Sequence, residues 1–246
     1  MEATEHSKLS TGDEDPHWSR RHSMRAAYWA VLRIYERSVP GDIVEFGTFA
    51  GNTAKSLAYG ISSAERMHRG RKQGREADTK RDLFLFDSFE GLPNVTSEVD
   101  RNHPDVIAGH WGPGKCKMHG PVELLEICGE FLDKNRIHIF PGWFSETIHK
   151  LENDQRFSVV YIDCDLYSST VDVLDGLFSG HHISAGALIY FDDFHCAASS
   201  EELGERRAWN EAVEKYQIKF MTGESYAATG QAFLIDNYNA LAIEKT

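Results

Sequence analysis

A chain of 246 residues with 41% hydrophobic and 26% charged residues has the composition of one globular α/β domain rather than two independent ones. A net charge of −12 argues against a nucleic-acid-binding surface, because phosphate binding depends on clustered Lys and Arg. No apolar run is long enough to span a membrane, and residues 1–16 lack the apolar stretch of a signal peptide, so we expect a cytoplasmic protein with its four scattered cysteines reduced.

Taken in chain order, the apolar patterns predict alternating helices and strands. An amphipathic helix over His17–Arg37 gives an N-terminal helical extension (residues 1–40), and Pro40-Gly41 ends it. Residues 41–246 then form the main domain. Its expected strands cover Asp42–Phe46, Leu83–Phe86, Ile137–Phe140, Val159–Ile162 and Ala187–Phe191, and its expected helices cover Asn52–Ile61, Val122–Leu132, Ser168–Phe178 and Glu205–Tyr216, with a short helix from Ser145.

Two connections and the tail complete the expected fold. The basic segment Arg66–Arg81 has no interleaved aromatic residues, and we interpret it as a solvated connection. The segment Ser88–Gly120 is rich in Gly, Pro and His without periodicity, which is typical of a lid-like loop. Ile218–Ile235 reads as two strands joined through Gly223 and Gly230. The fold class is therefore α/β, a doubly wound Rossmann-like sheet of seven strands closed by a C-terminal antiparallel hairpin.

The first turn, Glu45–Thr53, places a glycine motif between a strand and a helix, which is typical of a nucleotide-like cofactor site. Its glycines, Gly47 and Gly51, stand as GxxxG rather than GxGxxG, which disfavours pyrophosphate, and no Walker lysine follows. Asp87, at the end of the second strand, is suited to a ribose diol. The alternative is that the glycines are ordinary turn residues and Asp87 is a helix cap.

Two expected strands end in pairs of carboxylates, Asp163 with Asp165 and Asp192 with Asp193. One helix joins these strands in a right-handed crossover, so both pairs should emerge at the same sheet edge. Mutual repulsion makes such a cluster costly unless a cation occupies it, and the pattern therefore predicts a divalent-metal site. Alternatively, Asp163 and Asp165 cap the following helix, which would leave the second pair unexplained.

Five motifs carry a family resemblance. EFGTFAGNT resembles motif I of class I S-adenosylmethionine-dependent methyltransferases, in the glycine-poor form of the metal-dependent catechol O-methyltransferase group. The other motifs resemble the macrocin/mycinamicin (TylF-like) sugar O-methyltransferase family, which includes the noviose O-methyltransferase of coumarin antibiotics. They are FDSFEGLP (Phe86–Pro93), PGWFSETI (Pro141–Ile148), IDCDLYSST (Ile162–Thr170) and FDDF (Phe191–Phe194). Arg66–Arg81 departs from the family as an insertion, and Ser88–Gly120 matches no further motif beyond FDSFEGLP, which leaves the acceptor open.

The resemblance implies a Mg²⁺-dependent transfer of methyl from S-adenosylmethionine to a hydroxyl, most readily that of a sugar on a glycosylated natural product, as in antibiotic biosynthesis. It implies cofactor contacts by Glu45, Gly47, Thr48, Phe49, Gly51, Asn52 and Thr53 along methionine and ribose, Asp87 and Ser88 at the ribose, and Gly142, Trp143 and Phe144 beside the adenine. It implies Mg²⁺ on Asp163, Asp192 and Asp193, with Asp165 as the catalytic general base. His103, His110 and His119 are candidates for a second base or a substrate contact.

Other functions fit parts of the pattern. A catechol-like phenol is an alternative acceptor. An NAD(P)-dependent oxidoreductase would share the sheet but lacks GxGxxG, and a metal-dependent hydrolase would leave the glycine turn and Asp87 without a purpose. A further alternative is that the acidic sheet edge only binds a partner and catalyses nothing, in which case adding a cofactor should not affect the protein. We expect a small-molecule acceptor, no nucleic acid and no membrane partner, and we leave a homo-oligomer open.

Overall fold

The computed structural model describes residues 16–69 and 80–239, and within them the strands form one seven-stranded sheet in the order β3-β2-β1-β4-β5-β7-β6. The strands are β1 (Asp42–Phe46), β2 (Leu83–Asp87), β3 (Ile137–Pro141), β4 (Phe157–Ile162), β5 (Ile183–Phe191), β6 (Lys219–Tyr226) and β7 (Gly230–Asn237). β1 to β5 are parallel, while β7 runs antiparallel to β5 and to β6. The expected doubly wound sheet with a C-terminal hairpin is confirmed.

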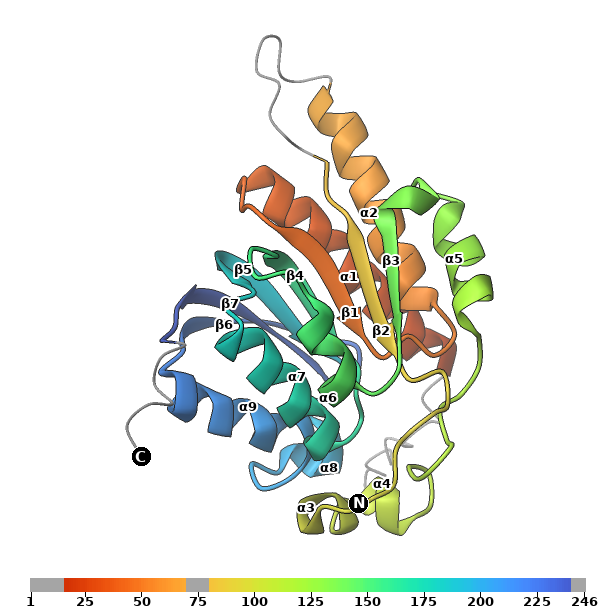
Figure 1. Cartoon of the computed structure of the whole chain (residues 1–246). Helices are drawn as coiled ribbons and strands as arrows, with labels where there is room; N and C mark the ends of the chain where they lie inside the picture. The colour runs from red at the N-terminus through yellow and green to blue at the C-terminus, as the bar shows by residue number, and fades with distance from the viewer. Residues whose placement is uncertain (1–15, 70–79, 240–246) are drawn as a thin grey trace, which may run out of the picture.

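Helices cover both faces of this sheet (Figure 1). One face packs against α1 (Pro16–Glu36), α2 (Asn52–Arg69) and α5 (Pro121–Gly129), and the other against α6 (Phe144–Thr147), α7 (Tyr167–Ser179) and α9 (Gly204–Tyr216). Shorter elements are the helices α3 (Glu98–Arg101), α4 (Pro104–Ile107) and α8 (Cys196–Ser199) and the 3-10 turns η1 (Lys134–Arg136) and η2 (Ile148–Lys150). Because β1, β2 and β4 are buried on both sides, their sequences are nearly continuous apolar runs.

The strand register aligns the candidate site residues. Phe46 of β1 pairs with Phe86 of β2 and with Ile162 of β4, and Ile162 pairs with Phe191 of β5. The residues that follow these four partners therefore leave the sheet side by side at its carboxyl edge, which is where open α/β sheets bind ligands.

The N-terminal helix contributes side chains to the core of the main domain. Ala27, Ala30 and Ile34 of α1 are fully buried in the same apolar cluster as Leu57 and Ile61 of α2. Among the helices of residues 16–69 and 80–239, none is both long and apolar enough to cross a membrane.

The basic connection differs from the expected solvated segment at both ends. α2 continues to Arg69, and residues 70–79 lie outside the described residues. Arg81 is buried, and its guanidinium donates hydrogen bonds to the carbonyl oxygens of Val39 and Gly41 and to Ser158 Oγ, 2.9 Å away. The arginine thus ties the start of β2 to β1 and β4.

Residues 88–120 lie beyond the carboxyl ends of the strands (Figure 1) and are more ordered than the expected lid-like loop. The segment contains α3 and α4, and Leu92 exchanges backbone hydrogen bonds with Gly114 and Lys115. The buried Asp100 accepts hydrogen bonds from the backbone N–H groups of Tyr167 (2.7 Å) and Ser168 (3.3 Å). A carboxylate at the start of α7 satisfies N–H groups that lack a partner within the helix, so it anchors the loop there.

Candidate active site

A pocket of about 350 Å³ lies at the carboxyl edge of the sheet. Eight residues expected at a cofactor line it: Gly47, Thr48, Phe49, Asp87, Ser88, Gly142, Trp143 and Phe144. The loop after β2 adds residues such as Leu92 and Asn94, and Asp163 and Asp165 form a further part of the wall. Residues from four strand ends therefore meet around one cavity.

Four other expected cofactor residues do not line the pocket. Glu45 is buried beneath the turn, and its Oε2 has no hydrogen-bond partner among the described residues. Burial raises the pKa of Glu45 well above its usual range, with a further contribution from the Asp87 charge. A Cβ on Gly51 would lie 2.9 Å from Leu124 Cδ1, so this glycine permits helix packing. Asn52 and Thr53 begin α2 and are partly buried.

Asp87 connects the turns that follow β1 and β2. Its Oδ2 accepts hydrogen bonds from Thr48 N (2.7 Å) and Thr48 Oγ1 (2.8 Å), and its Oδ1 accepts one from Phe89 N (2.7 Å). Oδ2 also accepts a longer hydrogen bond from Phe49 N (3.4 Å), so the remaining acceptor capacity of the carboxylate is on Oδ1. Phe49 (φ +39°) and Phe89 (φ +56°) adopt left-handed backbone conformations that are unusual for these residues. The turns are thus held in shape partly by Asp87.

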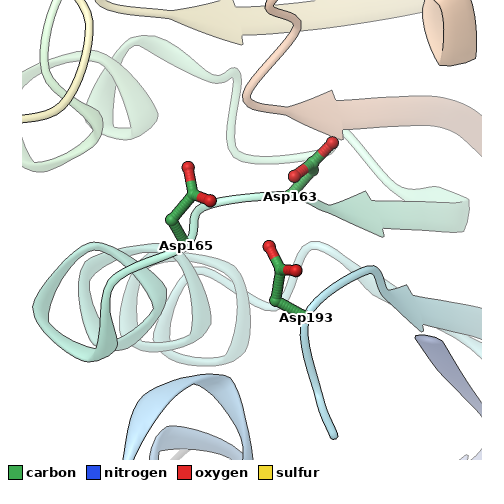
Figure 2. A group of neighbouring side chains, drawn as sticks. All are labelled: Asp163, Asp165 and Asp193. Atoms are coloured by element: carbon green, nitrogen blue, oxygen red, sulfur yellow. The ribbon is translucent and has the colours of Figure 1, made fainter. Parts of the chain in front are cut away.

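Three carboxylates converge beside this turn. One oxygen from each of Asp163, Asp165 and Asp193 lies within 4.8 Å of the others. Figure 2 shows Asp163 and Asp165 on the loop after β4 and Asp193 on the loop after β5, with the Asp193 carboxylate directed toward the other two. The predicted meeting of the two strand ends is therefore present in the structure.

Asp192 does not join this group, although the sequence placed it there. Its Oδ1 accepts hydrogen bonds from Tyr161 Oη (2.5 Å) and from Ser23 Oγ of α1 (2.8 Å). Successive side chains along a strand point to opposite faces, and this alternation continues past β5. Asp192 therefore faces α1, whereas the Asp193 carboxylate points toward Asp163. Asp165 takes the third place among the converging carboxylates.

Burial and mutual repulsion govern the charge of the group. Burial raises the pKa of Asp163 well above its usual range, and the charges of Asp192, Asp193 and Asp165 raise it further. Burial, with the charge of Asp193, does the same for Asp165, while burial and the charge of Asp192 raise the pKa of Asp193 to about 7. Carboxylate oxygens crowded in this way fit a hard divalent cation such as Mg²⁺, which would offset their repulsion.

Several contacts around the site could not be found from sequence patterns. Cys116 lines the pocket together with Asp165, and partial desolvation together with the nearby carboxylates raises the pKa of its thiol to about 12. His103, His110 and His119 do not line the pocket. His103 is buried instead, stacked on Trp111 at 4.4 Å between ring centroids. A lone cysteine or histidine in an irregular segment has no spacing that would reveal these partners.

Comparison with known proteins gives consistent matches. The macrocin O-methyltransferase (TylF) family matches residues 19–219 of this chain. A curated relative from Streptomyces olivaceus, 8-demethyl-8-(2,3-dimethoxy-alpha-L-rhamnosyl)-tetracenomycin-C 4'-O-methyltransferase, is 28% identical over 191 residues. The match covers 73% of this chain and 62% of the relative, so the chain spans less than two thirds of that protein's length.

Two solved structures share the fold. The O-methyltransferase NovP superposes with a TM-score of 0.67 at 22% identity, covering 89% of this chain and 80% of NovP. The calicheamicin methyltransferase CalS11 superposes with a TM-score of 0.61 at 23% identity, covering 86% of this chain and 77% of CalS11. With the family match over most of its length and this shared architecture, the chain belongs to the macrocin O-methyltransferase family and has the class I methyltransferase fold.

Proposed function

We propose that the protein is a Mg²⁺-dependent O-methyltransferase that moves a methyl group from S-adenosylmethionine to a hydroxyl of a sugar carried by a small molecule. The observation that carries the proposal is the shared pocket, because Asp163, Asp165 and the glycine turn at Gly47 all line the same cavity. Membership of the family supports methyl transfer, and the rhamnosyl group named in the Streptomyces olivaceus relative supports a sugar hydroxyl as the acceptor.

The chain's own groups suit the parts of the cofactor. Thr48, Asp87 and Ser88 would hold the ribose, because all three line the pocket and Asp87 Oδ1 retains acceptor capacity. Trp143 and Phe144 offer aromatic surface for the adenine. The unpaired Glu45 Oε2 beneath the turn would be satisfied by an ammonium group such as that of methionine.

The carboxylates would divide the remaining tasks. When bound, Mg²⁺ would increase the acidity of an acceptor hydroxyl, and S-adenosylmethionine would supply a methyl group on a positively charged sulfur. Asp163 and Asp193 would hold the ion. Asp165 lies in the pocket wall, and one of its carboxylate oxygens would take the proton of the hydroxyl. Mg²⁺ held by Asp163 and Asp193 would favour the ionised form of Asp165, which is the form that accepts a proton.

A methyl-transfer assay tests the proposal. The protein is incubated with S-adenosylmethionine, MgCl₂ and either a rhamnosylated aromatic polyketide or catechol, and the products are analysed by mass spectrometry. We expect one methyl group on the rhamnoside, no product in EDTA, and recovery when Mg²⁺ is added back. Methylation of catechol alone would show that the acceptor is a phenol, and full activity in EDTA would exclude the metal.

The role of Asp165 is tested in the same assay. Asp165→Asn keeps the side-chain shape but removes the proton acceptor, so turnover should fall by about 10²-fold or more. Binding of S-adenosylhomocysteine should not change, because Asp165 is not among the proposed cofactor contacts. Undiminished turnover would assign the base elsewhere.

A further inference from the structure

Glu205, at the start of α9, is fully buried and reaches both loops that carry the converging carboxylates. Its Oε2 accepts a hydrogen bond from the backbone N–H of Asp193 (2.9 Å), and its Oε1 accepts one from the backbone N–H of Cys164 (3.3 Å). Cys164 lies between Asp163 and Asp165, so a single carboxylate joins the loop after β4 to the loop after β5.

We propose that Glu205 is a positioning residue that sets the spacing of Asp163, Asp165 and Asp193 before a metal ion binds. The inference rests on the proposed Mg²⁺-dependent function and assigns a task to a residue outside the carboxylate group itself. Glu205 does not line the pocket, and it acts through the backbone of its two partners.

Helix capping does not account for these contacts. An acidic residue in the first turn of a helix ordinarily accepts hydrogen bonds from its own helix or interacts with the helix dipole. Glu205 instead bonds to two loops that follow different strands. Gly204 has φ +58°, a left-handed conformation that favours glycine, and it turns the chain so that residue 205 enters the core.

The conformation of the loops after β4 and β5 is unfavourable by itself, so it must be stabilised by contacts from elsewhere in the fold. Three carboxylates whose oxygens lie within 4.8 Å of one another repel when they are ionised, which is the form that binds a metal ion, and this repulsion would drive the two loops apart. Asp165 also has φ +59°, a conformation that costs a non-glycine residue on the order of 1 kcal/mol. Hydrogen bonds from both loops to one buried carboxylate oppose this separation, since a buried N–H without a partner is costly.

Metal binding in Glu205 variants tests this role. Binding of Mn²⁺, a paramagnetic substitute for Mg²⁺, is measured by electron paramagnetic resonance, and binding of S-adenosylhomocysteine by calorimetry. Glu205→Gln keeps the volume but turns an NH₂ group toward one of the two N–H groups. Partners behind metal ligands typically contribute 10- to 100-fold to affinity, so Mn²⁺ affinity should fall by about tenfold. Affinity for S-adenosylhomocysteine should stay unchanged, and Glu205→Ala should lose more Mn²⁺ affinity than Glu205→Gln.

The matched control is Glu214→Gln, which changes an exposed carboxylate of the same helix and should leave Mn²⁺ binding as it was. Native Mn²⁺ affinity in both Glu205 variants would overturn the inference while leaving the proposed function standing. If the Glu205 variants lose cofactor affinity and melting temperature along with Mn²⁺ affinity, Glu205 has a purely structural role, and this result would also overturn the inference. Absence of Mn²⁺ binding to the native protein would overturn the metal site and the inference together.

The native protein provides a measurement that does not depend on folding of the variants. The amide hydrogens of Cys164 and Asp193, followed by nuclear magnetic resonance, should be protected from exchange without metal and should change little when Mg²⁺ is added. Protection that arises only after Mg²⁺ addition would mean that the ion itself orders the loops, which contradicts preorganisation by Glu205.

Discussion

A Cβ atom on Gly47 would lie 1.9 Å from the carbonyl oxygen of Asp163, far inside van der Waals contact. Gly47 also has φ +85°, and the backbone N–H of Asp163 donates to the carbonyl oxygen of Phe46 (2.9 Å). The turn proposed to hold the cofactor and the loop proposed to hold the metal are therefore in direct backbone contact. We therefore expect a change in the turn to affect the loop.

Gly47→Ala should weaken binding of S-adenosylhomocysteine and of Mn²⁺ together, because the new methyl group must displace the Asp163 backbone. Calorimetry and electron paramagnetic resonance measure the two affinities. Gly109→Ala is the matched control: Gly109 has a similar φ of +75°, but a methyl group added there would meet no atom within 4 Å, so the variant carries the backbone strain without the clash. Loss of binding in both variants would attribute the effect to strain alone.

The metal-free protein should become less stable as the pH rises. Burial and the charge of Asp192 raise the pKa of Asp193 to about 7, whereas the pKa of an Asp in an unfolded chain is about 4. Between these values the unfolded chain has lost a proton that the folded chain keeps, so increasing pH favours unfolding. Calorimetric melting temperatures should fall across this range.

Magnesium should reverse that trend, since it stabilises the ionised carboxylates. The increase in melting temperature on adding MgCl₂ should be larger at about pH 8 than at about pH 5. Asp193→Asn should flatten the pH dependence of the metal-free protein. A melting temperature that rises with pH in EDTA would contradict the burial of these charges.

Asp192→Ala should affect folding more than metal binding. The substitution leaves the buried Tyr161 hydroxyl without its acceptor, which should lower the free energy of unfolding by about 1–3 kcal/mol. Asp163→Ala should instead abolish most Mn²⁺ affinity. Chemical denaturation and electron paramagnetic resonance separate the two effects. If Asp192→Ala loses Mn²⁺ as fully as Asp163→Ala, Asp192 is a ligand as the sequence indicated.

Asp100→Ala should loosen residues 88–120. The buried Asp100 bonds to the first N–H groups of α7, and loss of such a cap costs about 1 kcal/mol. Hydrogen exchange followed by mass spectrometry should be faster in this segment and at Tyr167 and Ser168. Glu98→Ala, an exposed change in the same short helix, is the control. Rapid exchange of the segment in the native protein would restore the interpretation of a mobile lid.

Much of the fold could be predicted because strands buried on both faces leave apolar runs, as β1, β2 and β4 do. The edge at which Asp163 and Asp193 meet followed from the crossover rule. The direction of Asp192 could not be predicted, because only the structure shows whether alternation continues past the strand end.

Two anchoring residues were beyond the reach of sequence patterns for another reason. Glu205 and Asp100 act on backbone groups that are distant along the chain, and they lie in or beside irregular segments without periodicity. The burial of Arg81 could not be predicted either, because a basic residue in a basic run gives no sign that backbone carbonyl groups will surround it.

Calorimetric titration of the native protein with S-adenosylhomocysteine and, separately, with NAD⁺ tests the central claim most directly, because it requires no knowledge of the acceptor. The pocket formed by the Gly47 turn and Asp87 should bind S-adenosylhomocysteine at a single site and should give no heat with NAD⁺. Binding of NAD⁺ without binding of S-adenosylhomocysteine would contradict the methyltransferase account.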